Sequence, residues 1–262
     1  MFDSGVGGLT VLRSLYTSLP RESTIYLGDN ARVPYGELPG ETIRRYTLEC
    51  LDYLYHRGVK ALVIACNTAT SEALESAQSR YDVPVIGVIE CTAREVASTA
   101  GERVGVLATE ATVRSGQYGA AIRSARPELQ VLEQPCPGLA ARVEACALNS
   151  PQTRSMLENF LQPLQDAGVD TVVLGCTHYA FLRDIVKQLM GPGVEMAECG
   201  PSTVSVLESL MERGVLDRAE GGVASHRLLT TGRALPFQRI ARLLFAGDLP
   251  RVEEVKIEVA GE

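Results

Sequence analysis

The sequence predicts an α/β protein built from two pseudo-symmetric domains with parallel sheets. One short motif occurs twice, as Ala61–Thr68 and Thr171–His178, and each copy places a cysteine directly after an apolar run and a small residue. The two cysteines, Cys66 and Cys176, differ in position by 110, which is about the length of a small domain. Apolar runs also alternate with helix-period segments along the chain, which is typical of parallel strands joined by right-handed crossovers.

The predicted strands are short apolar runs. Several lack the alternation of half-exposed strands, so we expect both faces of each sheet to be covered. In chain order the strands are Thr24–Leu27, Ala61–Ala65, Pro84–Ile89, Arg103–Leu107, Gln130–Gln134, Thr171–Leu174, Glu195–Glu198 and Arg227–Thr231. Amphipathic periodicity predicts helices between them, including Glu41–Arg57, Ser71–Arg80, Gln152–Ala167, Phe181–Met190, Thr203–Arg213 and Pro236–Phe245.

The repeat also predicts the domain organisation. The first domain is expected to comprise residues 1–90 and the second residues 91–200. Residues 201–262 hold a helix, a strand, another helix and a charged tail, which is too little for a domain. We therefore expect residues 201–262 to return and complete the first domain.

Composition excludes several classes of protein. The 262 residues carry a net charge of −7 without a basic run, which argues against a nucleic-acid partner. No apolar stretch approaches the roughly 18 residues of a membrane span, and no signal peptide is visible. The seven cysteines form no CxxC pair, and the chain is too large to need disulfide stapling, so a reduced cytoplasmic setting fits best.

Cys66 and Cys176 are the main candidates for chemistry. A thiol between a strand end and a helix N-terminus faces unpaired N–H groups and positive dipole potential, which favour the thiolate. One such thiol suggests a nucleophile, whereas two related thiols suggest removing a proton from one face of a carbon and returning it on the other. The alternative is that cysteine fills the core, which we keep for Cys50, Cys91, Cys136, Cys146 and Cys199.

Other cysteine and cofactor chemistries fit less well. Cys176 and His178 are two residues apart, but the four-ligand spacing of structural zinc is missing. No GxSxG motif is present, and no arginine follows Cys66 at the spacing of a phosphatase loop. The three lysines are also poorly placed for a pyridoxal Schiff base: Lys60, Lys187 and Lys256.

Two loops carry further candidates. The glycines of Phe2–Gly8 allow the backbone to cradle a carboxylate or phosphate, although neither a Rossmann fingerprint nor a P-loop is present. Within this loop Asp3 is either an active carboxylate or a helix N-cap. The segment Asp29–Gly36 is a functional loop or a turn, and Glu144 alone would be interpreted as a solvated helix residue.

Taken together, the motifs resemble those of the bacterial glutamate racemases, within the cofactor-independent aspartate/glutamate racemase superfamily. They occur in the family's order and span nearly the whole chain. The matching blocks are Phe2–Leu9, Pro34–Gly36, Ala65–Thr70, Gly87–Glu90, Val143–Glu144 and Gly175–Tyr179.

The resemblance implies an active site between the two domains that binds glutamate and needs neither cofactor nor metal. It assigns Cys66 and Cys176 as acid/base thiols that take the proton from D-glutamate and L-glutamate respectively. Asp3 would assist Cys66, and His178 with Glu144 would assist Cys176. The implied substrate-binding residues are Asp3, Ser4, Tyr35, Gly36, Asn67, Thr68, Thr177 and His178.

The implied function is to supply D-glutamate for peptidoglycan, with glutamate as the small-molecule partner and neither nucleic acid nor membrane as a partner. A homodimer stays an open alternative. Two rival functions are a fold relative that binds a dicarboxylate or a protein without turnover, and a racemase for aspartate or another amino acid. The intact cysteine pair weighs against the first rival, and His178 weighs against the second.

The chain departs from the family pattern at a few positions. Cys91 and Ala180 stand where family members usually have proline, and Glu198–Cys199 replaces a commoner acidic-small pair. Only Met1 and Phe2 precede Asp3, although family members have a short apolar strand there. We therefore expect the natural protein to begin several residues upstream.

Overall fold

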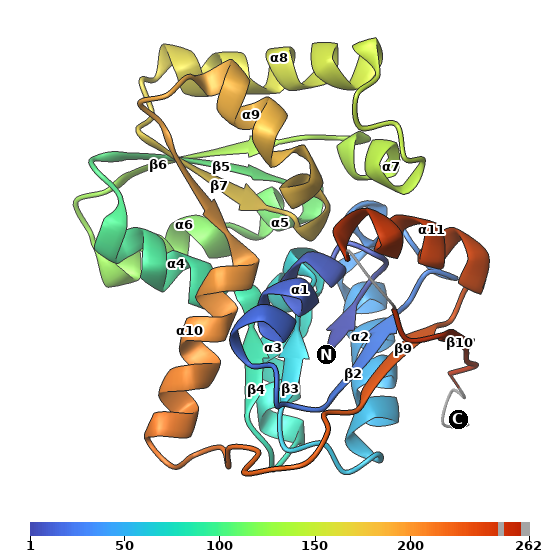
Figure 1. The fold of residues 1–262 in the computed structure, drawn as a ribbon. Helices are drawn as coiled ribbons and strands as arrows, with labels where there is room; N and C mark the ends of the chain where they lie inside the picture. Colours follow the sequence, from blue (N-terminus) through green and yellow to red (C-terminus); the bar gives the residue numbers. More distant parts are fainter. Residues whose placement is uncertain (246–248, 258–262) are drawn as a thin grey trace.

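The computed structural model describes residues 1–245 and 249–257 (Figure 1). Within these residues the chain forms two parallel sheets, and each predicted strand is found in one of them. Sheet A has six strands in the order β10-β9-β2-β1-β3-β4, and sheet B has four in the order β6-β5-β7-β8. The prediction of two parallel-sheet α/β units is therefore confirmed.

The strands are short, as the apolar runs predicted. Sheet A contains β1 (Phe2–Asp3), β2 (Thr24–Gly28), β3 (Leu62–Ile64), β4 (Val85–Gly87), β9 (His226–Thr230) and β10 (Val252–Glu254). Sheet B contains β5 (Arg103–Ala108), β6 (Gln130–Pro135), β7 (Thr171–Gly175) and β8 (Glu195–Glu198).

Two strand predictions need correction. The predicted strand Pro84–Ile89 ends at Gly87, because a helix begins at Val88 and uses the following apolar residues for its buried face. The strand β10 lies in the segment that was predicted to be only a charged tail, and it pairs with β9. The last residues of that tail lie outside the described part of the chain.

Helices follow most of the strands. They are α1 (Leu9–Ser18), α2 (Gly40–Tyr55), α3 (Asn67–Arg80), α4 (Val88–Thr99), α5 (Glu110–Ser115), α6 (Gln117–Ala125), α7 (Leu139–Glu144), α8 (Pro151–Asp166), α9 (Arg183–Met190), α10 (Cys199–Glu212) and α11 (Ala234–Leu244). Two 3₁₀ helices, η1 (Tyr35–Glu37) and η2 (Thr177–Leu182), lie in loops. The predicted helix Phe181–Met190 therefore begins as 3₁₀ and becomes α-helical only at Arg183.

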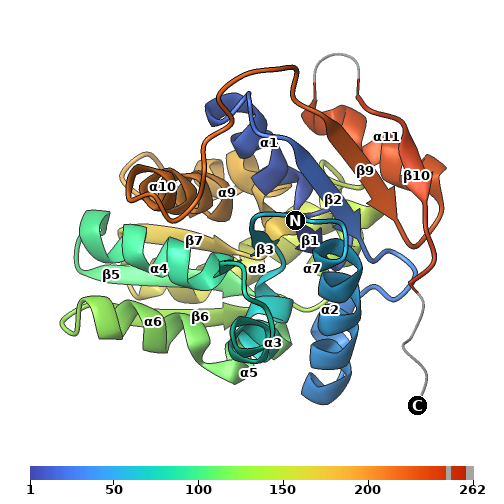
Figure 2. The same cartoon turned by 90° about the horizontal axis from the view of Figure 1, so that it is seen from below.

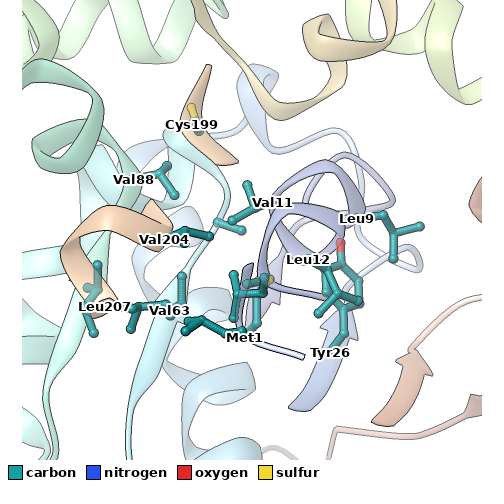
Figure 3. Close-up of a cluster of buried hydrophobic side chains, with 14 of the residues drawn as sticks. Met1, Leu9, Val11, Leu12, Tyr26, Val63, Val88, Cys199, Val204 and Leu207 are labelled. Carbon is teal, nitrogen blue, oxygen red and sulfur yellow. The ribbon is translucent and has the colours of Figure 1, made fainter. Parts of the chain in front are cut away.

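Both faces of sheet A are covered, which explains why its strands are apolar throughout. Leu62 and Ile64 of β3 pack in the cluster that contains α2 and α3, whereas Val63 packs in the cluster that contains α1, α10 and α11. Figure 2 shows these two helix layers on opposite sides of the strands. Figure 3 shows part of the second cluster, where Leu207 of α10 lies near Val63 and Leu12 of α1 lies near Tyr26.

Sheet B is covered in the same way. Val172 and Leu174 of β7 pack in the cluster with α8 and α9, and Val173 packs in the cluster with α4 and α6. The alternation along β7 thus matches that along β3, and Cys176 follows β7 much as Cys66 follows β3. The pseudo-repeat in the sequence corresponds to two similar strand–cysteine–helix units, one in each sheet.

The chain passes between the two sheets twice. It leaves sheet A after β4, and α4 then packs against α6 beside sheet B. It leaves sheet B after β8, and α10 then packs against α1 and α4. The strands β9 and β10 return to sheet A, where β9 pairs with β2. The residue boundaries predicted for the two domains stay a prediction.

Among the described residues, none of the helices combines the length and apolar character that a bilayer crossing requires.

Candidate active site

A cavity of about 190 Å³ lies where residues of sheet A face residues of sheet B. Its wall includes residues that directly follow strands of both sheets. Cys66 follows β3 after one residue, and Thr109, Cys136 and Cys176 follow β5, β6 and β7. Ligands of parallel sheets bind beyond the carboxyl ends of the strands, and this cavity lies at those ends.

Cys66 is the N-cap of α3, and its thiol has polar neighbours. Its Sγ accepts from the Ala69 N–H at 3.4 Å and lies 3.3 Å from Ser4 Oγ. Burial and the negative charge of Asp3 nevertheless raise the pKa of Cys66 to about 12, against the smaller opposing effects of Ser4 and Ala69. The helix N-terminus favours the thiolate, as the sequence led us to expect, but desolvation outweighs it here.

Cys176 has different neighbours. Its Sγ lies 3.7 Å from Nδ1 of His178, and Nε2 of His178 lies 2.7 Å from Oε1 of Glu144. Burial opposes charge on His178, but the Cys176 sulfur and the Glu144 carboxylate outweigh burial and hold the pKa of His178 well above its usual value. His178 also holds the pKa of Glu144 below its usual value, despite burial. These neighbours therefore favour the protonated imidazole beside the second thiol.

Glu144 is the last residue of α7, and it is more than a solvated helix residue. Its side chain is 25% exposed, lines the cavity and also approaches the glycine loop of sheet A. The Val6 N–H donates to Glu144 Oε1 at 3.5 Å. Residues of both sheets therefore hold the carboxylate in place beside His178.

Asp3 ends β1, between β2 and β3, and is fully buried. Its Oδ1 accepts from the Gly5 N–H at 2.9 Å, and its Oδ2 accepts from the Thr177 hydroxyl at 3.1 Å. The helix α1 begins later, with Gly8 as its N-cap, so the N-cap reading of Asp3 does not apply. Burial raises the pKa of Asp3, although the charge of His178 partly offsets the effect.

The structure brings most of the predicted site residues to one cavity. Cys66, Cys176, Glu144 and His178 line it. So do the predicted substrate-binding residues other than Asp3, namely Ser4, Tyr35, Gly36, Asn67, Thr68, Thr177 and His178. Asp3 is absent from the cavity wall. It lies behind the wall, bonded to Thr177, the residue that follows Cys176.

The segment Asp29–Gly36 contributes part of the wall. Asp29 is fully buried and accepts from Arg32 Nε at 2.6 Å, from the Tyr35 hydroxyl at 2.5 Å and from the Thr231 hydroxyl at 2.7 Å. These bonds fix Tyr35 at the cavity, where η1 begins. Of the two readings open from the sequence, functional loop or turn, the structure shows a loop that lines the site.

Sequence reasoning missed several residues of the wall, including Thr109, Cys136, Pro137, Gly138, Ala140 and Ala141. Thr109 is the N-cap of α5, and its hydroxyl lies 2.9 Å from the Thr68 hydroxyl of sheet A. The signal that finds Thr109 and Cys136 is their place directly after a strand, the same rule that selected Cys66 and Cys176. Cys136 lacked a repeated motif and was assigned to the core.

All seven cysteines are free thiols in the structure. Cys176 and His178 lie together, as the rival metal reading required. Within the described part of the chain, however, no group of three or more His, Cys, Asp and Glu side chains is arranged to hold a metal ion.

The comparisons with known proteins agree with this fold and site. The family model described as Asp/Glu/Hydantoin racemase matches residues 8–206. A glutamate racemase of Geobacter metallireducens is 40% identical over 263 residues, covering 100% of this chain and 97% of that protein. The protein belongs to the Asp/Glu/hydantoin racemase family and is an amino-acid racemase. The resemblance to glutamate racemases inferred from the motifs is confirmed.

Solved structures give the same result. The crystal structure of glutamate racemase isoform RacE1 from Bacillus anthracis superposes with a TM-score of 0.92 at 34% identity, covering 98% of this chain and 96% of that one. A glutamate racemase from Francisella tularensis, solved in complex with D-glutamate, has a TM-score of 0.89 at 29% identity, with the same coverage of 98% and 96%.

Proposed function

We propose that this protein interconverts L-glutamate and D-glutamate by a two-thiol mechanism, without a cofactor. One observation carries the proposal. Two cysteines at equivalent strand ends of two similar units line one cavity, and their neighbours differ. Such a pair suits a reaction that removes a proton from one face of a carbon and delivers one to the other face.

In the proposed reaction one thiolate takes the Cα proton, and the electron pair of the broken C–H bond passes to the α-carboxylate. The opposite thiol then gives its proton to the other face of Cα. The substrate is neither oxidised nor reduced, and each turnover exchanges the protonation states of the two sulfurs. Because the Cα proton is a very weak acid, fixed donors around the carboxylate and exclusion of water must supply the stabilisation.

The unequal neighbours set the resting state that we propose. Cys66, whose pKa is raised to about 12, is a thiol and serves as the acid. The imidazolium of His178, held by Glu144, stabilises negative charge on Cys176, which serves as the base. In this resting state Cys176 is poised to take the proton from L-glutamate. Turnover leaves Cys66 as the thiolate, ready to take the proton from D-glutamate.

The names of the relatives support glutamate as the substrate. They are named glutamate racemases, and the Francisella tularensis protein was solved with D-glutamate. We assign the substrate's carboxylates and amine to the cavity residues Ser4, Tyr35, Gly36, Asn67, Thr68 and Thr177. The product D-glutamate would serve peptidoglycan synthesis. The cytoplasmic setting expected from the reduced cysteines stays a prediction.

The test is to incubate the protein with L-glutamate, with no cofactor added, and to follow optical rotation. We expect rotation to decay to zero, and extensive dialysis against a chelator to leave the rate unchanged. An active protein whose activity is lost on dialysis and restored by zinc would move Cys176 and His178 into a metal site. A protein that binds glutamate without turnover would support the rival binding function instead.

A further inference from the structure

A buried polar cluster lies behind the cavity, made of Asn67, Tyr118 and Cys199. Their exposed fractions are 2%, 0% and 5%. Asn67 is the first residue of α3, Tyr118 belongs to α6, and Cys199 is the first residue of α10. The cluster therefore joins a helix of sheet A to a helix of sheet B and to the helix that connects the two sheets.

The contacts within this Asn67 cluster fix which way the amide points. The Tyr118 hydroxyl donates to Asn67 Oδ1 at 2.6 Å. Asn67 Nδ2 donates to Cys199 Sγ at 3.5 Å, and the same sulfur lies 3.6 Å from Oδ1. The short bond from Tyr118 holds the carbonyl end. Since an amide nitrogen has two hydrogens and Cys199 uses one, the other stays available among the described residues.

Asn67 itself lines the cavity and directly follows Cys66. An amide that turns its N–H toward the cavity suits a carboxylate, whereas one that turns its oxygen toward the cavity repels it. In the structure the Tyr118 hydroxyl donates to Oδ1, so the amide oxygen is held at Tyr118, which lies outside the cavity wall. Burial keeps Tyr118 in that donor form, because it holds the pKa of the hydroxyl well above its usual value.

Cys199 lies between the Asn67 amide and β7, the strand that leads to Cys176. Its Sγ lies 3.8 Å from the carbonyl oxygen of Leu174, two residues before Cys176. Figure 3 shows Cys199 at the start of α10, near Val88 and Val204 of the apolar cluster. Burial raises the pKa of this thiol as well, so it acts as a neutral spacer between Asn67 and β7.

We propose that Tyr118 and Cys199 are positioning residues that orient the Asn67 amide so that its N–H faces a carboxylate of the bound amino acid. The role rests on the proposed function. Neither residue touches substrate. Tyr118 acts through Asn67, and Cys199 keeps Asn67 in register with the strand that leads to Cys176.

The first test is Tyr118→Phe, assayed in both directions of glutamate racemisation. We take this carboxylate to be that of the substrate's side chain, which carries the same charge before and during proton transfer, so losing its donor weakens ground state and transition state alike. We expect KM to rise about three- to tenfold, the range for one hydrogen bond, while kcat changes by less than about twofold. A KM for Tyr118→Phe equal to that of the wild type would overturn the proposal.

The matched control is Tyr81→Phe. Tyr81 caps the other end of α3 and is also buried, but its hydroxyl donates to Asp52 at 2.8 Å, away from the cavity wall. We expect this variant to keep the wild-type KM. An equal rise in KM for Tyr81→Phe would mean that removing any tyrosine hydroxyl beside α3 raises KM. It would contradict a specific role for Tyr118.

A double-mutant cycle tests whether Tyr118 acts through Asn67. In an Asn67→Ala background, Tyr118→Phe should add no further change in KM, because the amide that it orients is gone. If the two effects on KM multiplied, Tyr118 would act by another route and the proposal would fail.

Cys199 provides a second pair of variants should Tyr118→Phe fold poorly. Cys199→Ser keeps a small group that donates and accepts, so it should keep the wild-type KM, whereas Cys199→Ala should raise it. Wild-type KM in both variants would overturn the role of Cys199. A wild-type protein that did not racemise glutamate at all would overturn the proposed function and this role with it.

Discussion

At the scale of single residues, the two thiols of this racemase differ in their surroundings. Cys66 is buried beside Ser4 and near the carboxylate of Asp3, which favours the neutral thiol. Cys176 lies beside His178, whose pKa is held well above its usual value. In the proposed mechanism, two chemically identical groups start the reaction in different protonation states.

Replacing either thiol by serine tests whether both are needed. A hydroxyl is far harder to ionise than a thiol, so Cys66→Ser and Cys176→Ser should each lose nearly all racemisation, by at least about 10²-fold. Cys146→Ser, at a half-exposed cysteine outside the cavity wall, is the control and should keep wild-type turnover. Near wild-type activity in Cys176→Ser would exclude the two-base scheme.

The pKa of His178 depends on Glu144, and NMR titration can measure it because the chain has only three histidines. The wild-type midpoint should lie well above 6.5. Glu144→Gln removes the negative charge that favours the imidazolium, so the midpoint should fall, by roughly one to three pH units. Turnover of L-glutamate at neutral pH should fall with it.

His226 serves as the internal reference for this titration, since burial alone holds its pKa below the usual value and its Nδ1 lies 3.0 Å from the Thr24 hydroxyl, not beside Glu144. Its midpoint should be the same in both proteins. An unchanged His178 midpoint in Glu144→Gln would contradict the account of the second thiol.

The sequence predicted the place of both thiols in the site, because each follows an apolar strand and that pattern can be recognised from neighbouring residues alone. It could not predict the protonation of Cys66, because burial and the approach of Asp3 depend on the folded chain. It also missed Thr109, whose hydroxyl meets Thr68 across the two sheets. Asp3 was predicted at the site but lies behind its wall, since the backbone of Gly5 turns to meet its carboxylate.

At the scale of elements, the glycine loop between β1 and α1 packs closely against η2, which follows Cys176. A Cβ added at Gly7 would lie 2.9 Å from the backbone nitrogen of His178 and 2.7 Å from its Nδ1, and would also meet the Thr177 hydroxyl. The glycine thus permits a close approach between an element of each sheet, and this approach holds the site together.

Gly7→Ala should therefore force η2 away from the loop. We expect a loss of about 1–3 kcal/mol of stability, a lower melting temperature and a large loss of turnover, because His178 and Thr177 move. Gly193→Ala is the control, since a Cβ there meets nothing within 4 Å. If Gly7→Ala melted and turned over like Gly193→Ala, the close approach would be unimportant.

The elements themselves were largely predictable from apolar periodicity, and the misses have physical reasons. The run Pro84–Ile89 is apolar throughout, so nothing local marks the change at Val88 from strand to helix. The strand β10 has charged, exposed residues because it is the edge strand of sheet A, next to β9 alone. Pairing partners, which the sequence does not show, decide such cases.

At the scale of the whole molecule, two similar units place their strand ends around one cavity. In the proposed function both carboxylates of the substrate are held there at once, by Ser4, Tyr35 and Asn67 from one unit and by Thr177 from the other, all of which line the cavity. A substrate one methylene shorter leaves a polar group unpaired or pulls Cα out of line with the thiols.

We therefore expect glutamate to be preferred over aspartate, by about tenfold or more in kcat/KM. Parallel assays with the two L-amino acids under identical conditions measure this ratio. A ratio near one would favour the rival reading of a racemase with broader specificity.

The most direct test of the two-thiol account follows hydrogen at Cα in deuterium oxide. The protein converts a small fraction of L-glutamate, and the two enantiomers are then separated and weighed by mass spectrometry. If one sulfur removes the proton and the other delivers one, the D-glutamate formed should carry deuterium at Cα, while the remaining L-glutamate keeps protium. Deuterium appearing equally fast in the remaining L-glutamate would mean that a single group serves both faces, and would contradict the account.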